Sequence, residues 1–282
     1  FFISKIDLKL NYYKLINNYM TTIKNINFPA SKVSSIVRKN PFNKFEDVFE
    51  EMKCRITGDK YKTLNDTNTF NKEDLKKLSQ ELIPDIKIPD KDLNLETILK
   101  QSCKNAVNCN TTQESHKLES DIKRKISNIL PNKDLKDIKE FINTDINTKR
   151  GIKNEEVIIQ NYNKKHKTII TDNNDKLFTY PLIEINKNNI LYKFNISAKI
   201  DGLNDGMLIE IKNRRNKLLG KIPEYEKVQL EIYLRILQLP IGKLVENYNN
   251  TFQEHIYNSN DKLWNYILEE LYSFSHLLLD NI

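Results

Sequence analysis

Cysteine is scarce in this sequence, and its histidines are isolated. The chain has three cysteines, Cys54, Cys103 and Cys109, and no C-x-x-C pair. Three scattered cysteines do not make a disulfide framework, and without a C-x-x-C pair a zinc ribbon or a four-cysteine iron–sulfur cluster is not expected. The four histidines have no partner at a spacing typical of a metal site or of Ser/His catalysis. We therefore expect free thiols in a reducing compartment and no histidine chemistry.

The sequence also lacks a phosphate-binding loop, a membrane span and a secretory signal. Neither G-x-G-x-x-G nor a Walker pattern is present, which argues against an ATP-driven motor. No apolar run approaches the roughly 20 residues that a transmembrane helix needs. The first residues, Phe1-Phe2-Ile3-Ser4-Lys5, lack the charged start and the small-residue cleavage site of a signal peptide. We expect a soluble, intracellular protein.

Positive charge is what the sequence has in excess. Lys and Arg number 45 against 38 Asp and Glu, which gives a formal net charge of +7. An excess of this size favours a polyanionic partner. It does not choose between DNA, RNA and an acidic protein, so the identity of the partner has to come from the chemistry of a site.

The first half of the chain shows helical rather than strand-like patterns. Apolar residues at helical spacing predict a helix from Ile3 to about Ile23. Ser31 is suited to cap the next short helix, because its hydroxyl can accept from amides two or three residues on. Residues 55–149 hold charged helical segments separated by prolines. We predict a helical N-terminal part of the core, 1–54, and a helical insertion, 55–149.

The second half, residues 150–282, has the pattern of an α/β core. Residues Glu155 to His166 predict a helix, and apolar residues then alternate along 178–196, as in β-strands. Asn204-Asp205-Gly206 predicts a tight hairpin, because both central positions of a type I′ turn need positive φ. A helix is expected from Pro223 to about Leu239, followed by two short strands at Leu244-Val245 and His255-Ile256-Tyr257 and a last helix that starts at Asp261. The expected fold class is α/β: a central mixed β-sheet flanked by helices, within a single domain that spans 1–282.

The hairpin carries the residues best suited to chemistry. Side chains alternate along a strand, so Glu210 and Lys212 point to one face, and the short hairpin returns Asp201 beside Glu210. Asp201, Glu210 and the carbonyl of Ile211 offer the hard oxygen ligands that Mg²⁺ prefers, and Lys212 would hold the attacking water in phosphodiester hydrolysis. The alternative is a solvated strand face beside an acidic turn, since E-x-K triplets are common.

Several further motifs occur in order around this hairpin. Gly151 and Glu155 precede it, Gln229-x-x-x-Tyr233 follows it on one face of a helix, and Pro29-Ala30-Ser31 with Asn40-Pro41-Phe42 stand upstream. Together with Ile200-Asp201-Gly202 and Leu208-Ile209-Glu210-Ile211-Lys212, they resemble the PD-(D/E)xK nuclease superfamily and, within it, the lambda-type exonucleases, or YqaJ-like viral recombinases. The resemblance covers residues from about 20 to 53 and from 150 to 280. It implies a restriction-endonuclease-like core.

The resemblance implies a role for each matched residue of the centre. Asp201 and Glu210 would be metal ligands, and Lys212 would be the base or orienter of the attacking water. Glu155 would bind or orient the metal's water. Gln229 would support the site from its helix.

The resemblance also implies residues that bind the phosphates of DNA. Exonucleases of this family hold a terminal 5′-phosphate with an arginine and two serines. Ser31 matches one serine, Lys24 stands where the arginine would be, and Lys199 stands in place of the second serine. Lysine lacks the bidentate fork of arginine, so strict 5′-end specificity is not implied. Arg214 and Arg215, directly after the catalytic strand, are expected to contact backbone phosphates.

The sequence therefore predicts a Mg²⁺-dependent deoxyribonuclease, in which Mn²⁺ can substitute, that acts as an exonuclease on ends of double-stranded DNA. The resemblance further implies viral or phage-type recombination, repair or replication, at the site of viral DNA replication if the source is a virus. It also implies a ring-shaped homo-oligomer and a single-strand annealing or replication protein as partner. The alternatives are an endonuclease or structure-specific nuclease, and a non-catalytic DNA-binding or assembly protein on a nuclease fold.

Overall fold

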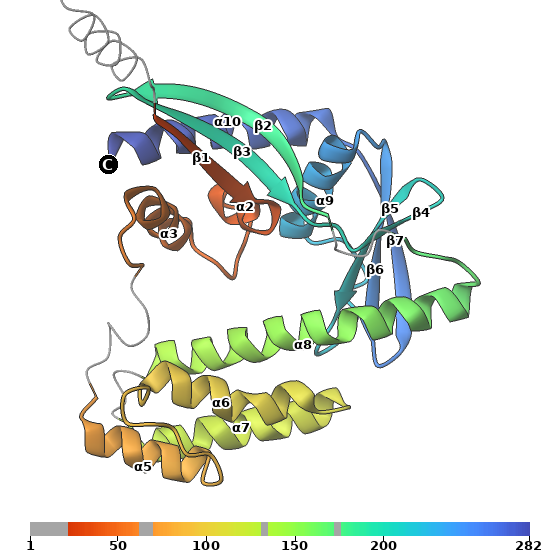
Figure 1. The fold of residues 1–282 in the computed structure, drawn as a ribbon. Coiled ribbons are helices and arrows are strands. Elements are labelled where there is room, and N and C mark those ends of the chain that lie inside the picture. The colour runs from red at the N-terminus through yellow and green to blue at the C-terminus, as the bar shows by residue number, and fades with distance from the viewer. Residues whose placement is uncertain (1–21, 62–69, 131–134, 172–175) are drawn as a thin grey trace, which may run out of the picture.

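The strands form two mixed sheets, joined by the chain between Ala198 and Gly202 (Figure 1). The computed structural model describes residues 22–61, 70–130, 135–171 and 176–282. In the first sheet, β3 lies between a parallel β1 and an antiparallel β2; the second has the order β4-β5-β6-β7, with β5 parallel to β6. The strands are β1 (Thr22–Pro29), β2 (Phe178–Lys187), β3 (Ile190–Ala198), β4 (Gly202–Asn204), β5 (Met207–Asn213), β6 (Ile241–Tyr248) and β7 (Thr251–Asn258). The predicted α/β class is confirmed, with the strands divided between two sheets rather than gathered in one.

Strand β1 begins at the last two residues of a predicted helix and continues through a segment for which no strand was predicted. Most of that helix, residues 3–21, lies outside the described residues, but 22–29 are extended. Ile26 and Phe28 alternate with exposed asparagines and enter the core, which is the period of a strand. The predicted cap at Ser31 is also wrong. Helix α2 (Ala30–Ile36) starts directly after β1 with Pro29 at its N-cap, so Ser31 is already helical and exposed.

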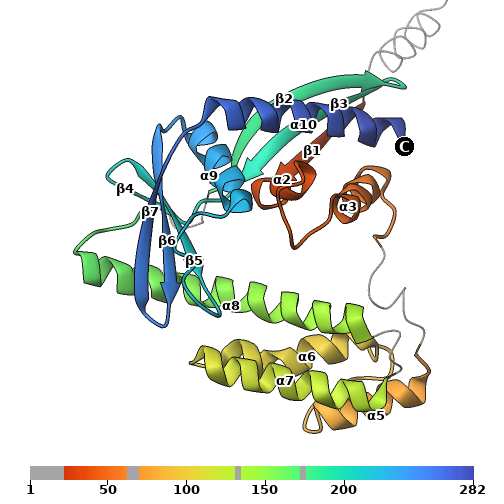
Figure 2. The same ribbon diagram turned by 180° about the vertical axis from the view of Figure 1, so that it is seen from behind.

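Helices cover one face of the first sheet (Figure 2). Phe28 of β1 and Phe194 of β3 stack on each other, with 5.5 Å between ring centroids, and Phe274 meets the Phe28 ring edge-on. Phe274 belongs to the last helix, and all three rings are buried. This aromatic contact holds helix to sheet. The helices packed in this part are α2, α3 (Phe45–Thr57), α9 (Glu224–Leu237) and α10 (Asp261–Asp280).

A second hydrophobic core lies in the helical region that precedes β2. Its buried residues include Leu78, Ile98, Ile126 and Ile138, one from each of four helices. These helices are α5 (Lys72–Leu82), α6 (Leu95–Asn108), α7 (Thr112–Ile129) and α8 (Leu135–His166). The region is helical, as predicted. However, α8 runs without a break through the predicted boundary at 149/150, so the helical region and the second sheet share one helix.

Helix α8 connects the two regions because its buried face changes along its length. Ile138 and Ile142 enter the helical core, whereas Ile158 and Tyr162 pack on the second sheet. The sequence prediction began this helix at Glu155 and missed its first half. Although α8 and α10 are long, no helix in the described parts of the chain is apolar enough over a sufficient length to cross a membrane.

Candidate active site

Strand β5 separates two environments. Ile209 and Ile211 on one face pack with Ile158 and Tyr162 of α8, while Leu208 on the other face joins the core that contains α9. Glu210 shares the Leu208 face by alternation, and it is only 2% exposed. The strand therefore carries a buried carboxylate on the face that it shares with Leu208 and Lys212, whereas the sequence pattern predicted only a polar face there.

The hairpin brings Asp201 to Glu210. Its turn has φ of 49° at Asp205 and 76° at Gly206, as the predicted type I′ turn requires. Because Gly202 pairs with Ile209, Asp201 comes level with Glu210. The Oδ2 atom of Asp201 accepts a 2.7 Å hydrogen bond from the backbone N–H of Ile211, which fixes the carboxylate against β5.

Lys212 completes the group from the same strand face. Its Nζ donates a 2.5 Å hydrogen bond to Oε1 of Glu210, and its side chain is 27% exposed while that of Glu210 is 3% exposed. The structure thus brings together the two carboxylates and the ammonium group that the sequence singled out. Asp201, Glu210 and Lys212 are called the acidic centre from here on.

The two acids of the acidic centre have raised pKa values. Burial and the neighbouring Asp201 raise the pKa of Glu210 to about 8, against the opposing effect of Lys212. Burial likewise raises the pKa of Asp201. Burial disfavours the charged form of Lys212, but the charges of Glu210 and Asp201 outweigh this and raise its pKa. A cation bound between the two acids would favour their ionised forms.

The oxygens of this centre fit a hard divalent cation. Oε2 of Glu210 is buried and has no hydrogen-bond partner in the described structure, so it is an unused acceptor. Mg²⁺ is typically held by one or two carboxylates together with water and phosphate oxygens. Asp201 and Glu210 supply two such carboxylates. A group of three or more His, Cys, Asp or Glu side chains placed to hold a metal does not occur within the described residues.

Two helices bring further side chains to the acidic centre. Glu155 of α8 lies close enough to influence the pKa of both Asp201 and Glu210. On α9, Nε2 of Gln229 donates a 2.5 Å hydrogen bond to the hydroxyl of Tyr233. Burial and the charge of Glu210 raise the pKa of Tyr233, so the Q-x-x-x-Y pair lies beside the centre.

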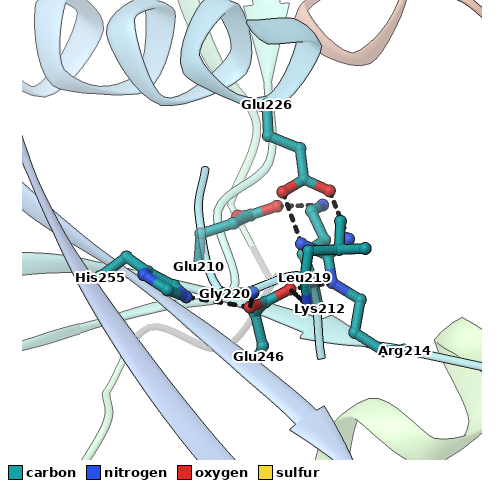
Figure 3. Close-up of polar contacts among 8 residues, drawn as sticks. All are labelled: Glu210, Lys212, Arg214, Leu219, Gly220, Glu226, Glu246 and His255. Atoms are coloured by element: carbon teal, nitrogen blue, oxygen red, sulfur yellow. Dashed lines mark hydrogen bonds and ion pairs between the residues drawn. The ribbon is translucent and has the colours of Figure 1, made fainter. Parts of the chain in front are cut away.

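Arg214 is held in a buried ion cluster (Figure 3). Its Nη1 and Nη2 atoms donate to the two carboxylate oxygens of Glu226 at 2.6 and 2.7 Å, and its Nε donates to Glu246 at 2.5 Å. Glu246, on β6, also accepts from the backbone N–H groups of Leu219 and Gly220, both at 3.1 Å, and lies 2.9 Å from Nε2 of His255. The guanidinium that the sequence assigned to DNA phosphates thus has internal carboxylate partners.

Arg215 also has partners within the protein. Its Nη1 donates to Asn147 of α8 at 2.6 Å, and its Nη2 pairs with Glu119 of α7. Glu119 is buried and also pairs with Lys123. Arg215 therefore ties the loop after β5 to the helical region.

The three residues matched to a 5′-phosphate grip are not brought together. Pro29 of β1 pairs with Ser197 of β3, so Ser31 and Lys199 follow the same end of the first sheet, and both are exposed. Lys24 is five residues before Pro29 on β1, which at about 3.3 Å per residue places it roughly 17 Å away along the strand. Its Nζ donates to the Ile56 carbonyl at 3.1 Å.

The sequence reasoning missed the carboxylates that surround Arg214. Glu246 is fully buried, and Glu226 is 3% exposed. The available signal was an acidic residue directly after Leu244-Val245 in a predicted strand. Nothing in the sequence linked it to Arg214, which is 32 residues away along the chain.

No family model matches this sequence, and no curated protein matches it significantly. Among solved structures, the chain is similar to an alkaline exonuclease from Laribacter hongkongensis, with a TM-score of 0.48, 14% identity, and coverage of 90% of this chain and 89% of that one. It is also similar to a phage-related exonuclease from Haemophilus somnus 129PT, with a TM-score of 0.35, 10% identity, and coverage of 78% and 99% respectively. These likenesses are distant, so the functional assignment rests on the side chains of the chain itself.

Proposed function

We propose that the chain is a divalent-metal-dependent deoxyribonuclease that cuts at the acidic centre and works as an exonuclease on ends of double-stranded DNA. One observation carries the hydrolytic part of this proposal. The half-buried Asp201 lies next to the buried Glu210, Lys212 pairs with Glu210, and one carboxylate oxygen of Glu210 has no partner among the described residues. The exonuclease part rests on the order of motifs shared with lambda-type exonucleases.

A bound Mg²⁺ or Mn²⁺ would neutralise the carboxylates and the attacked phosphate and lower the pKa of a water. The residues of the chain supply the rest. Asp201, fixed by the Ile211 N–H group, and Glu210 hold the cation. Lys212, which is fixed by Glu210, orients the attacking water and places positive charge beside the phosphate. Glu155 orients a further water from α8, and the Gln229–Tyr233 pair supports Lys212 from α9.

The two alternative functions would act differently on DNA. An endonuclease would use the same centre on continuous strands, and a non-catalytic DNA-binding protein would bind without cutting. The intact acidic centre argues against the second rival, because a buried carboxylate beside a second acid is costly and adds nothing to the binding of a polyanion. A ring-shaped homo-oligomer and an annealing or replication partner extend the proposal and are tested by sedimentation and by co-purification.

The test uses end-labelled linear duplex DNA and covalently closed circles, each with Mg²⁺, with Mn²⁺ and with EDTA. An exonuclease degrades only the linear form, and only with metal. Asp201→Asn and Glu210→Gln should each lower the cleavage rate by at least about a hundredfold, since each removes a charge that holds the cation. Glu224→Gln, which removes an exposed carboxylate from α9, serves as the matched control.

The other outcomes would replace the proposal. Nicking of closed circles identifies an endonuclease, and tight DNA binding with no metal-dependent cleavage identifies a binding protein. Cleavage that survives both Asp201→Asn and Glu210→Gln places the reaction elsewhere in the chain.

A further inference from the structure

A cleft of about 510 Å³ lies between the helical region, the loop after β5 and the loop after α2. Asn213, which lines it, directly follows Lys212 on β5. Gly151 on the α8 wall is four residues, or one helical turn, before Glu155 and so shares its helix face. The cleft is therefore lined by the chain neighbour of Lys212 and by a residue one turn from Glu155.

A second cavity of about 390 Å³ continues it along α8 towards the β6–β7 turn. Thr112, Arg150 and Asn213 line both cavities, so the two adjoin. The pair of cavities is called the amide-lined cleft from here on. The name follows from its lining, which is rich in asparagine, including Asn147, Asn216, Asn154, Asn161, Asn247, Asn249 and Asn250.

Charge in the amide-lined cleft is of one sign. No Asp or Glu is among the described residues that line either cavity, whereas Arg150, Arg214, Arg215 and Lys217 line the first. Arg214 is balanced by Glu226 and Glu246, and Arg215 by Glu119. Lys217 is exposed and forms no ion pair among the described residues. The cleft thus presents cations and neutral amides to whatever enters it.

Arg150 is the clearest sign of an anionic ligand. It is 7% exposed, and its Nη1 donates to two neutral groups, the carbonyls of Ala106 at 3.3 Å and Cys109 at 2.8 Å. It forms no ion pair within the described parts of the chain. In addition, Nε of Arg215 is buried without an acceptor. A nearly buried guanidinium without a carboxylate is costly, and an anion in the cleft offsets that cost.

Aromatic side chains lie at the mouth of the amide-lined cleft. Phe42 is 75% exposed, and its ring meets that of Tyr225 edge-on, with 5.6 Å between centroids. Both residues line the first cavity. An exposed aromatic face beside cations and amides is how proteins bind unpaired bases without reading their sequence.

We propose that the amide-lined cleft holds a single strand of DNA, as the path along which one strand runs to or from the acidic centre. Phe42 stacks on a base, Lys217 and Arg150 face phosphates, and the asparagines hydrogen bond to base edges and sugars. A cavity of about 510 Å³ has the size of a small-ligand site, so it accepts nucleotides of one strand and not a duplex. The choice of DNA rests on the proposed nuclease function.

The test measures binding of fluorescein-labelled oligo(dT) by anisotropy in EDTA, so that no cleavage occurs. Phe42→Ala should weaken binding by about 5-fold to 100-fold, as expected for loss of one base stack. Lys217→Gln should lower the slope of log affinity against log salt by about 0.7, as expected for one lost phosphate contact on a single strand. The controls Ile86→Ala and Lys104→Gln remove an exposed apolar and an exposed charged side chain from the helical region, away from the cleft lining.

Both variants replace exposed side chains, so each should melt at the wild-type temperature. The proposal is overturned if Phe42→Ala and Lys217→Gln bind oligo(dT) no more weakly than their controls. It is also overturned if they lose affinity for a blunt hairpin duplex but keep it for oligo(dT). Because binding is measured without metal, its outcome is independent of cleavage. If the protein does not cut DNA and its cleft variants bind oligo(dT) poorly, the nuclease proposal is contradicted and single-strand binding in the cleft is supported.

Discussion

Replacing Glu246 with Gln should destabilise the protein strongly, although it changes one atom. The two oxygens of Glu246 face four partners: Arg214, the N–H groups of Leu219 and Gly220, and His255. The side chain is fully buried, so water cannot replace a lost partner. A glutamine amide can keep its oxygen towards Arg214 and Leu219, but its NH₂ group then faces the N–H of Gly220.

The size of the effect follows from these contacts. Leaving the Gly220 N–H group without an acceptor costs about 1–3 kcal/mol, and exchanging a charged for a neutral acceptor of Arg214 costs about 1 kcal/mol more. The expected loss in the free energy of unfolding is therefore about 3 kcal/mol, at the lower end of what breaking a buried ion pair costs. Glu224→Gln, with a side chain 59% exposed, should cost at most about 1 kcal/mol.

Urea denaturation followed by circular dichroism measures the free energy of unfolding of both variants. Repeating it at acid pH gives a second test. Burial alone would raise the pKa of Glu246, but the contacts with His255, Arg214 and Leu219 outweigh it and lower the pKa. A group with a lowered folded pKa stabilises the fold above its unfolded pKa, about 4.3, and loses this contribution as the pH falls through the folded pKa. The gap between wild type and Glu246→Gln should thus shrink in acid. A variant as stable as Glu224→Gln at neutral pH would refute the reasoning.

Three further substitutions test the packing of the second sheet and of α8. Gly242→Ala should lower the free energy of unfolding by about 1–3 kcal/mol in urea denaturation, because the new Cβ would lie 3.2 Å from side-chain atoms of Leu208 and 3.3 Å from Leu234. Gly151→Ala should instead raise it by about 0.5–1 kcal/mol, because Gly151 lies on a helix and its new Cβ would meet nothing within 4 Å. Tyr162→Phe should lower the free energy of unfolding by about 1–2 kcal/mol, because it removes the 2.7 Å hydrogen bond to Glu254, and an unchanged melting curve would mean that this bond contributes nothing.

The acidic centre was predictable because it depends on local rules. The alternation of β5 puts Glu210 and Lys212 on one face, and the turn at Asp205-Gly206 fixes the register that brings Asp201 level with Glu210. No other part of the fold has to be known for this step. Apolar alternation likewise marked β2 and β3, which lie where the sequence placed them.

The surroundings of the centre were not predictable, because they depend on how distant segments meet. The sequence indicated no acidic partner for Arg214, because only the parallel pairing of β5 with β6 brings Glu246 to it. Lys24 and Ser31 were both matched to the phosphate-binding residues, but the extended strand β1 between them carries the two apart. Strand β1 was missed because its two buried residues, Ile26 and Phe28, give too short an alternation to compete with the helical pattern before it.

Metal titration tests the central claim most directly. The claim is that Asp201 and Glu210 together hold one divalent cation. Calorimetric titration of Mn²⁺ into the wild-type protein, Asp201→Asn, Glu210→Gln and Glu224→Gln should show one site in the wild type and the control, and at least about tenfold weaker binding in both variants of the acidic centre. Equal Mn²⁺ affinity in all four proteins, or no binding even by the wild type, would contradict the claim.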